Sequence, residues 1–215
     1  MNELSSEPRS EAKSGPKSTR LLLVRHGQTD WNRAGLWQGL ADRRLTETGR
    51  DQARAAAVEL EAELQTSRRD GESGFDRIWV SDLSRAGETA EIIAARLKLE
   101  ISVDLRLREL DVGDWSGRAR SEILERDAER LIAFEEGDPE IQAGGGESRV
   151  ALRLRAQAFV ADRAADSAGG RLIVVTHLGV IRALVPGADP TNAERIEVIA
   201  EEVISEEVVR RAEER

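Results

Sequence analysis

Two short runs of uninterrupted aliphatic residues constrain the fold of this chain most strongly. They are Leu21–Val24 near one end and Leu172–Val175 near the other. A run of this length without polar alternation fits a buried strand better than a helix, and burial on both faces is typical of parallel sheets. Between the two runs, apolar residues recur at helical spacing, as at Ala53, Ala57 and Leu60. Strands that alternate with helices in this way predict a three-layer α/β/α sandwich, with a mostly parallel sheet and helices on both faces.

Periodicity and turn residues place the remaining elements. We expect strands over 77–80, 101–103 and 196–200, and helices over about 46–65, 84–97, 117–135, 148–165 and 178–185. A polar loop is expected over 66–74. Residues 1–19 combine Ser, Pro, Glu and Lys with almost nothing to bury, which predicts a disordered polar tail. Residues 20–200 are expected to form one domain, and 201–215 a charged helical tail.

Charge and composition narrow the classes of partner. The chain has a formal net charge of −9, which argues against a nucleic-acid binder because such proteins usually carry a basic face. It has no cysteine, so disulfides and thiolate metal sites are excluded. Its apolar runs fall far short of the ~20 residues that span a bilayer, and no signal-peptide core is recognisable. We therefore expect a cytoplasmic protein without a membrane partner, while the sequence leaves the oligomeric state open.

The chain has only two histidines, and each follows a predicted buried strand. His26 comes directly after Arg25, and His177 directly after Thr176. Ligand sites in open α/β sheets lie outside the carboxyl ends of the strands, so both imidazoles are expected at one crevice. The alternative is that each histidine is a satisfied polar group in a turn.

An arginine lies at the predicted junction between a third strand and the helix that follows it. Arg85 falls in the first helical turn after the strand over 77–80. A cation is electrostatically unfavourable there, because the helix N-terminus already carries partial positive charge, unless both hold an anion together. The alternative is a surface ion pair of Arg85 with Glu88 or Asp82.

Five short motifs carry a resemblance to a known family. They are Arg25-His26-Gly27 with Trp31-Asn32 and Gln38-Gly39, Leu45-Thr46-Glu47-Thr48-Gly49, Ser81-Asp82-Leu83-Ser84-Arg85, Arg108-Glu109-Leu110-Asp111, and Gly145-Gly146-Glu147-Ser148 followed by Val175-Thr176-His177. In this order, over about residues 20–185, they resemble the histidine phosphatase superfamily, the phosphoglycerate mutase-like group. The resemblance implies phosphoryl transfer through a phosphohistidine, with no metal and no cofactor.

Carried over residue by residue, the resemblance assigns roles to nine positions. His26 would be the nucleophile, and Glu109 would protonate the leaving oxygen and then activate water. His177 would be a third catalytic residue. It would also bind the phosphoryl oxygens, together with Arg25, Arg85 and Asn32. Residues expected to contact the rest of the substrate are Gln38, Gly39 and Leu178. Without the motif, Glu109 would be read as a solvated loop carboxylate.

The chain departs from the family pattern at two places that bear on function. Leu178 follows the second histidine where many members have glycine, which predicts a narrower pocket. The segment between Gly117 and Gly144 is short compared with that of the mutases. Both favour a phosphomonoester hydrolase acting on a small phosphorylated metabolite. The alternatives are a phosphoglycerate mutase-type transferase and a non-catalytic module that binds phosphorylated ligands. Trp31, Trp37 and Trp115 could line the pocket or anchor the core.

Overall fold

A computed structural model describes residues 18–71, 73–167 and 169–204. Its strands form a five-stranded sheet in the order β3-β2-β4-β1-β5, in which only β5 is antiparallel to its neighbour. The strands are β1 (Arg20–Arg25), β2 (Arg77–Val80), β3 (Ile101–Val103), β4 (Arg171–Thr176) and β5 (Arg195–Ile199). The predicted mostly parallel sheet is therefore confirmed.

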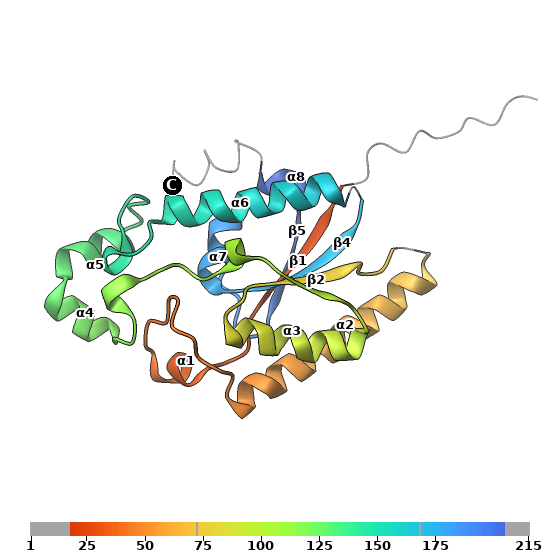
Figure 1. The fold of residues 1–215 in the computed structure, drawn as a ribbon, viewed down its shortest axis with the longest axis horizontal. Helices are drawn as coiled ribbons and strands as arrows, with labels where there is room; N and C mark the ends of the chain where they lie inside the picture. Colours follow the sequence, from red (N-terminus) through yellow and green to blue (C-terminus); the bar gives the residue numbers. More distant parts are fainter. Residues whose placement is uncertain (1–17, 72, 168, 205–215) are drawn as a thin grey trace, which may run out of the picture.

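Helices cover both faces of this sheet (Figure 1). The α-helices are α1 (Asp30–Ala34), α2 (Glu47–Arg69), α3 (Ser84–Leu97), α4 (Arg120–Arg126), α5 (Ala128–Glu135), α6 (Arg149–Asp166), α7 (Leu178–Leu184) and α8 (Ala200–Val203). Short 3-10 turns are η1 (Leu105–Leu107), η2 (Gly113–Trp115) and η3 (Ala143–Gly145). Helices α1, α4 and α5 lie together at one end of the molecule, beyond the sheet (Figure 1).

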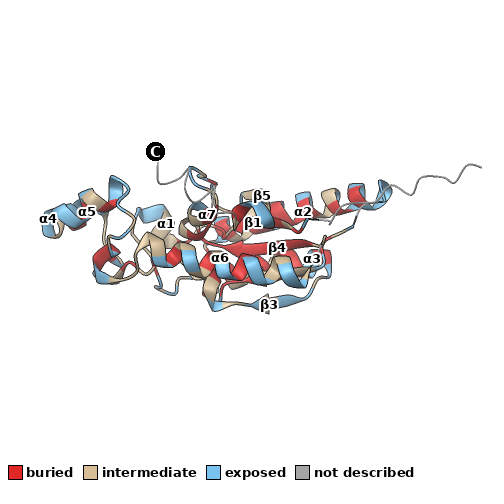
Figure 2. Cartoon of the chain, turned by 90° about the horizontal axis from the view of Figure 1, so that it is seen from above, coloured by how far each residue is buried: buried red, intermediate tan, exposed pale blue. Residues whose placement is uncertain are grey.

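Alternating side chains of the central strands fill two separate cores. Leu22 and Val24 of β1 face α2 and α3, whereas Leu21 and Leu23 face α6, α7 and α8. Strand β4 is buried along its whole length, as the run of aliphatic residues predicts. Figure 2 shows this burial concentrated in β1, β4 and the inner sides of the helices. The α/β/α sandwich is therefore confirmed.

Two helix predictions are wrong in their limits. Helix α2 was expected to end near Gln65 but continues to Arg69, because no helix-ending residue occurs before Asp70 and Gly71, and Gly71 adopts φ 74°. The single helix expected over 117–135 is two helices that meet at Asp127, whose backbone (φ −145°, ψ 46°) is not helical. The Asp127 carboxylate accepts a hydrogen bond from Trp115 Nε1 at 2.9 Å, which fixes this break.

The two terminal segments lie largely outside the described residues. Of the expected disordered tail over 1–19, only Ser18 and Thr19 are described, and Thr19 is buried with its hydroxyl donating to Ser167 O at 2.8 Å. Of the expected helix over 201–215, only residues up to 204 are described. The single turn α8 covers the start of this segment and buries Ala200 and Val203.

Candidate active site

The pairing of β1 with β4 brings the two histidines together. The strands are parallel neighbours with Arg25 opposite Thr176, so the residues that follow them leave the sheet side by side. The His26 amide donates to Thr176 O at 2.9 Å, and the ring centroids of His26 and His177 are 5.2 Å apart. Both rings are buried, at 3% and 0% exposure. The two histidines therefore form one unit at the carboxyl edge of the sheet.

A backbone carbonyl fixes the tautomer of His26. Its Nδ1 lies 2.7 Å from Gly27 O, and a carbonyl only accepts, so Nδ1 carries the proton. Burial, and then the charge of Arg85, hold the pKa of His26 well below its usual value. The ring is therefore neutral near pH 7, with an unprotonated Nε2 that can act as a nucleophile.

His177 has one ring nitrogen bound and one without a partner. Nε2 lies 2.9 Å from the Ser81 hydroxyl, whereas Nδ1 is buried and makes no hydrogen bond within the described part of the chain. Burial and the nearby Arg85 hold the pKa of His177 well below its usual value. An unsatisfied buried ring nitrogen is costly, so a ligand that accepts or donates there would be favoured.

Two guanidinium groups flank the histidines. Arg85 is fully buried and donates to Gly39 O and Ala41 O, both at 2.8 Å. Arg25 donates to Pro190 O at 2.8 Å, and both arginines keep a buried Nε without a partner. Burial lowers the pKa of both groups, and the Glu109 carboxylate opposes that shift. The sequence alternative for Arg85, a surface ion pair, is wrong.

A carboxylate faces the same space from the loop after η1. Glu109 is half-buried, with Oε1 accepting from Leu110 N at 2.8 Å and Oε2 from Gly179 N at 3.3 Å. A Cβ on Gly179 would lie 2.2 Å from Glu109 Oε1, so only glycine allows α7 to approach this carboxylate. The first turn of α7 thus holds Glu109 at the site, and Glu109 is not a freely solvated loop residue.

The remaining predicted residues also reach this space. Asn32 closes the capping box of α1, where its Oδ1 accepts from Thr29 N at 3.0 Å. Gln38 Oε1 accepts from the Thr29 hydroxyl at 3.0 Å. Gly39 has φ 51° and packs so closely on Val112 that a Cβ would meet Val112 Cγ2 at 2.5 Å. The α1 segment is therefore held by its own caps, at the rim of the site.

A cavity of about 510 Å³ opens between these elements. Eight of the nine predicted site residues line it, and the exception is His177, which is fully buried next to His26. Trp37 also lines the cavity, whereas Trp115 is a core residue packed edge-on against Trp37, with ring centroids 5.2 Å apart. Leu178, the first residue of α7, also lines the cavity.

The loop before β5 positions His26, and the sequence analysis missed this loop. Asn192 Nδ2 donates to His26 O at 3.0 Å, and the Ala193 amide donates to Arg25 O at 3.0 Å. Ala193 adopts φ 63°, a left-handed conformation that costs a non-glycine residue about 1 kcal/mol or more. This strained turn is maintained because it satisfies the carbonyls at the end of β1.

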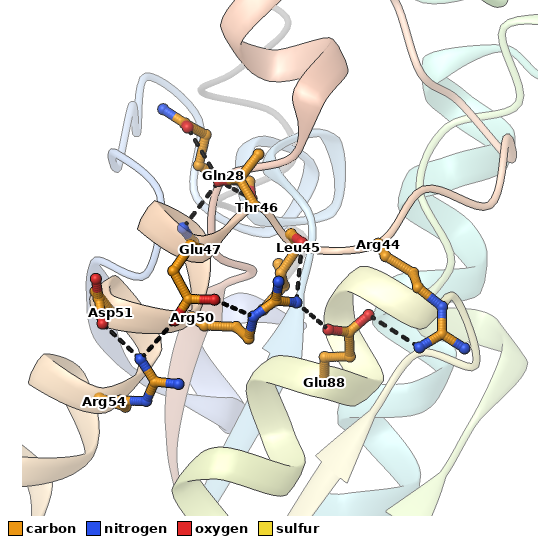
Figure 3. Close-up of polar contacts among 10 residues, drawn as sticks. Gln28, Arg44, Leu45, Thr46, Glu47, Arg50, Asp51, Arg54 and Glu88 are labelled. Carbon is orange, nitrogen blue, oxygen red and sulfur yellow. Dashed lines mark hydrogen bonds and ion pairs between the residues drawn. The ribbon is translucent and has the colours of Figure 1, made fainter.

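The turn after His26 also rests directly on the first turn of α2. A Cβ on Gly27 would lie 2.4 Å from Gly49 O, and one on Gly49 would lie 2.2 Å from Gln28 O. Figure 3 shows the polar contacts around this junction. The Thr46 hydroxyl donates to Gln28 O, and the Arg50 guanidinium donates both to Leu45 O and to the Glu88 carboxylate of α3. The two motif glycines therefore allow the backbone approach that sets the position of His26.

Three further arginines line the cavity and were missed: Arg149, Arg153 and Arg182. On helices α6 and α7 they are indistinguishable in sequence from solvated surface arginines, so no local signal identified them.

Within residues 18–71, 73–167 and 169–204, no group of three or more His, Cys, Asp or Glu side chains could hold a metal ion. In the same residues no helix is long and apolar enough to span a membrane.

Comparisons with known sequences and solved structures give matches over most of the chain. The sequence profile of the histidine phosphatase superfamily (branch 1) matches residues 21–213. The chain is 38% identical to phosphoglycerate mutase-like protein 4 of Arabidopsis thaliana, covering 83% of this chain and 74% of the relative. It is 36% identical to glucosyl-3-phosphoglycerate phosphatase of Mycobacterium tuberculosis, covering 78% and 74%. The solved structure of a mycobacterial glucosyl-3-phosphoglycerate phosphatase in complex with VO3 matches with a TM-score of 0.73 and 34% identity, covering 83% and 90%.

Proposed function

Because this chain belongs to the histidine phosphatase superfamily, we propose that it is a phosphomonoester hydrolase that acts on a small phosphorylated metabolite through a phosphohistidine on His26. The observation that carries the proposal is the contact between the His26 and His177 rings, 5.2 Å apart, beside the buried guanidinium group of Arg85 and the half-buried Arg25. Relatives named as glucosyl-3-phosphoglycerate phosphatase and phosphoserine phosphatase support hydrolysis of small phosphoesters.

In the first step, the lone pair of His26 Nε2 attacks phosphorus and the bond to the leaving oxygen breaks. Glu109, which lines the cavity beside His26, donates its proton to that oxygen, so that the alcohol leaves neutral. Charge on the three remaining oxygens is stabilised by Arg25, Arg85 and the Nδ1–H of His177. Because the Ser81 hydroxyl donates a hydrogen bond to His177 Nε2, the proton of the neutral His177 ring lies on Nδ1 and can be donated to a phosphoryl oxygen.

In the second step, water attacks the phosphohistidine and the N–P bond breaks. The Glu109 carboxylate takes the proton from water, and His26 Nε2 recovers its lone pair as inorganic phosphate forms. Splitting the reaction into two transfers lowers each barrier, and the protein contributes chiefly positioning and charge stabilisation. No step requires a metal ion or cofactor.

Four further assignments belong to the same proposal. Asn32 contributes an amide at the phosphate end of the cavity, and Gln38, Gly39 and Leu178 contact the substrate's remaining atoms. A small phosphorylated substrate, with neither nucleic acid nor membrane as partner, fits a cavity of about 510 Å³. The cytoplasmic location expected from the cysteine-free composition also remains a proposal, and fractionation of cells that express the tagged chain tests it.

A panel of phosphoesters tests the proposed function. We expect steady release of free phosphate in excess EDTA, and its loss in His26→Ala. Transfer of the phosphoryl group to a second substrate hydroxyl, without release of phosphate, would instead identify a mutase. Binding of phosphoesters without turnover of any of them would identify a non-catalytic module.

A further inference from the structure

Two residues outside the cavity fix the loop that carries Glu109. Arg155 of α6 and Glu147, which comes shortly before that helix, form an ion pair in which Arg155 Nε lies 2.8 Å from Glu147 Oε1. Their side chains are only 23% and 17% exposed, and neither lines the cavity at His26. Glu147 belongs to the motif Gly145-Gly146-Glu147-Ser148, which takes no part in the proposed chemical steps. A partly buried ion pair often contributes little net stability, because desolvation offsets its Coulomb gain, so this pair calls for a further explanation.

Every N–H group of the Arg155 guanidinium has an acceptor. Two of them bind the Glu147 carboxylate, Nε to Oε1 and Nη2 to Oε2, both at 2.8 Å. The other three bind backbone carbonyls of the segment that leads to Glu109. Nη1 donates to Arg106 O and Arg108 O, both at 2.6 Å, and Nη2 donates to Glu109 O at 2.9 Å. Because the guanidinium is rigid and planar, it holds these carbonyls at fixed relative positions and so fixes the backbone of Glu109.

The chain that follows Glu109 is held by the same motif. The Glu147 amide donates to Asp111 O at 2.8 Å, and Glu147 Oε2 accepts from the Asp111 amide at 3.4 Å. The backbone of Gly146 packs against the same carbonyl, since a Cβ at this position would lie 2.4 Å from Asp111 O. The loop is therefore fixed on both sides of Glu109, by Arg155 up to that residue and by Glu147 two residues beyond it.

The position of the Glu109 carboxylate depends on this backbone. Its own hydrogen bonds come from two amides, Leu110 N at 2.8 Å and the more distant Gly179 N at 3.3 Å. The first of these amides belongs to the fixed loop, so a shift of the loop moves the carboxylate away from Gly179 and α7. A general acid must lie within hydrogen-bond reach of the leaving oxygen, and a displacement of about 1 Å costs about 100-fold in rate. Contacts on the far side of the loop can therefore control proton transfer inside the cavity.

We propose that Arg155 and Glu147 are positioning residues for Glu109: without touching the substrate, they place its carboxyl group where it can protonate the leaving oxygen. This inference rests on the proposed function, because it takes Glu109 as the proton donor. The proton is transferred only in the transition state, so the pair acts on kcat and leaves KM nearly unchanged. It matters for an alkyl phosphate, whose alkoxide must be protonated, and hardly for 4-nitrophenyl phosphate, whose leaving group departs as a stable anion.

Steady-state kinetics of Arg155→Lys on these two esters test the positioning role. Lysine keeps the charge opposite Glu147, but its single nitrogen cannot reach three carbonyls and a carboxylate at once. We expect kcat on the alkyl phosphate to fall about 10- to 100-fold at nearly unchanged KM, while kcat on 4-nitrophenyl phosphate stays within about threefold. Glu147→Gln, which removes the counterion of the guanidinium, should show a smaller loss with the same preference. Equal losses on both esters, or no loss on the alkyl phosphate, would overturn the proposal.

Arg171→Lys is the matched control. Arg171 also pairs with two carboxylates, Glu63 and Glu197, but it begins β4 and so lies at the opposite edge of the sheet from His177. Urea unfolding should show a loss of stability for this variant as for Arg155→Lys. The ratio of kcat on the two esters should nevertheless stay within about twofold of that of the unmodified chain, because distant sites act independently. A change of ratio as large as that of Arg155→Lys would contradict the proposal, since the loss of any ion pair would then suffice.

Amide hydrogen exchange separates this outcome from that of the proposed function. If neither ester is hydrolysed, NMR on the intact chain still reports the position of Glu109, because the amides of Leu110 and Gly179 donate to its carboxylate. Both amides should exchange at least about tenfold faster in Arg155→Lys, whereas the amide of Ile181, which donates to His177 O, should keep its rate. Unchanged exchange at Leu110 and Gly179 would refute the positioning role independently of turnover.

Discussion

Replacing Gly179 with alanine should impair catalysis without unfolding the protein. The added Cβ would lie 2.2 Å from Glu109 Oε1, about 1 Å closer than real contacts allow, so the carboxylate must move by about that distance. Glu109 is the end of a side chain and can move, whereas the backbone of α7 is held by the buried Val180 and Ile181. The methyl group therefore displaces the proposed proton donor and leaves the helix in place.

The expected magnitudes for Gly179→Ala differ between activity and stability. A 1 Å misplacement of a catalytic group costs about 100-fold in rate, and a general acid contributes about 10²- to 10⁴-fold in all. We expect kcat to fall about 100-fold on an alkyl phosphate. Alanine is about 1 kcal/mol more favourable than glycine within a helix, so the free energy of unfolding should change by no more than about 1 kcal/mol.

A double-mutant cycle with Glu109→Gln identifies the route of this effect. If the methyl group acts through Glu109, adding Gly179→Ala to Glu109→Gln should have little further effect. The loss should also be smaller on 4-nitrophenyl phosphate, whose leaving group departs as a stable anion and needs no proton. Steady-state kinetics on both esters and urea unfolding provide the data. Additive losses, equal on both esters, would refute the reasoning.

Three further predictions concern the groups around the histidines. Arg85→Met should raise the barrier of the first step by about 3 kcal/mol, which lowers kcat near 100-fold. In urea unfolding it should also destabilise the fold by about 1–3 kcal/mol, because Gly39 O and Ala41 O lose their hydrogen-bond donor. Gly27→Ala should destabilise the fold by about 2 kcal/mol or more in the same assay, since its Cβ would meet Gly49 O at 2.4 Å. The pKa values of His26 and His177 are lowered in the folded state, so the unfolded chain binds more protons than the folded chain below about pH 6.5. The free energy of unfolding should therefore decrease as the pH is lowered below that value. The slope is at most about 2.7 kcal/mol per pH unit for two histidines and should be halved in His26→Asn; no slope would contradict their burial as neutral rings.

The central strands and the histidine pair could be predicted because their signals are local. A run such as Leu172–Val175 identifies a buried strand, and the residue that follows it must lie at the carboxyl edge. Once β1 and β4 are neighbours, the proximity of His26 and His177 follows from their register.

Other features depend on contacts that no local pattern records. The break at Asp127 exists because its carboxylate accepts a hydrogen bond from Trp115, twelve residues away in the chain. Asn192 supports His26 only because β5 returns antiparallel beside β1. Arg149 faces the cavity because α6 is oriented by its packing through Leu152 and Phe159, and the same residue on another helix face would be solvated.

The central claim is that His26 Nε2 becomes bonded to phosphorus while its Nδ1–H stays on Gly27 O. Rapid quenching with a ³²P-labelled substrate, followed by digestion in alkali, would trap the adduct and locate it. The account predicts an acid-labile, alkali-stable 3-phosphohistidine at position 26 that forms and decays at least as fast as turnover and is absent from His26→Ala. Turnover without such an adduct, or phosphate on Nδ1 of His26, would contradict it.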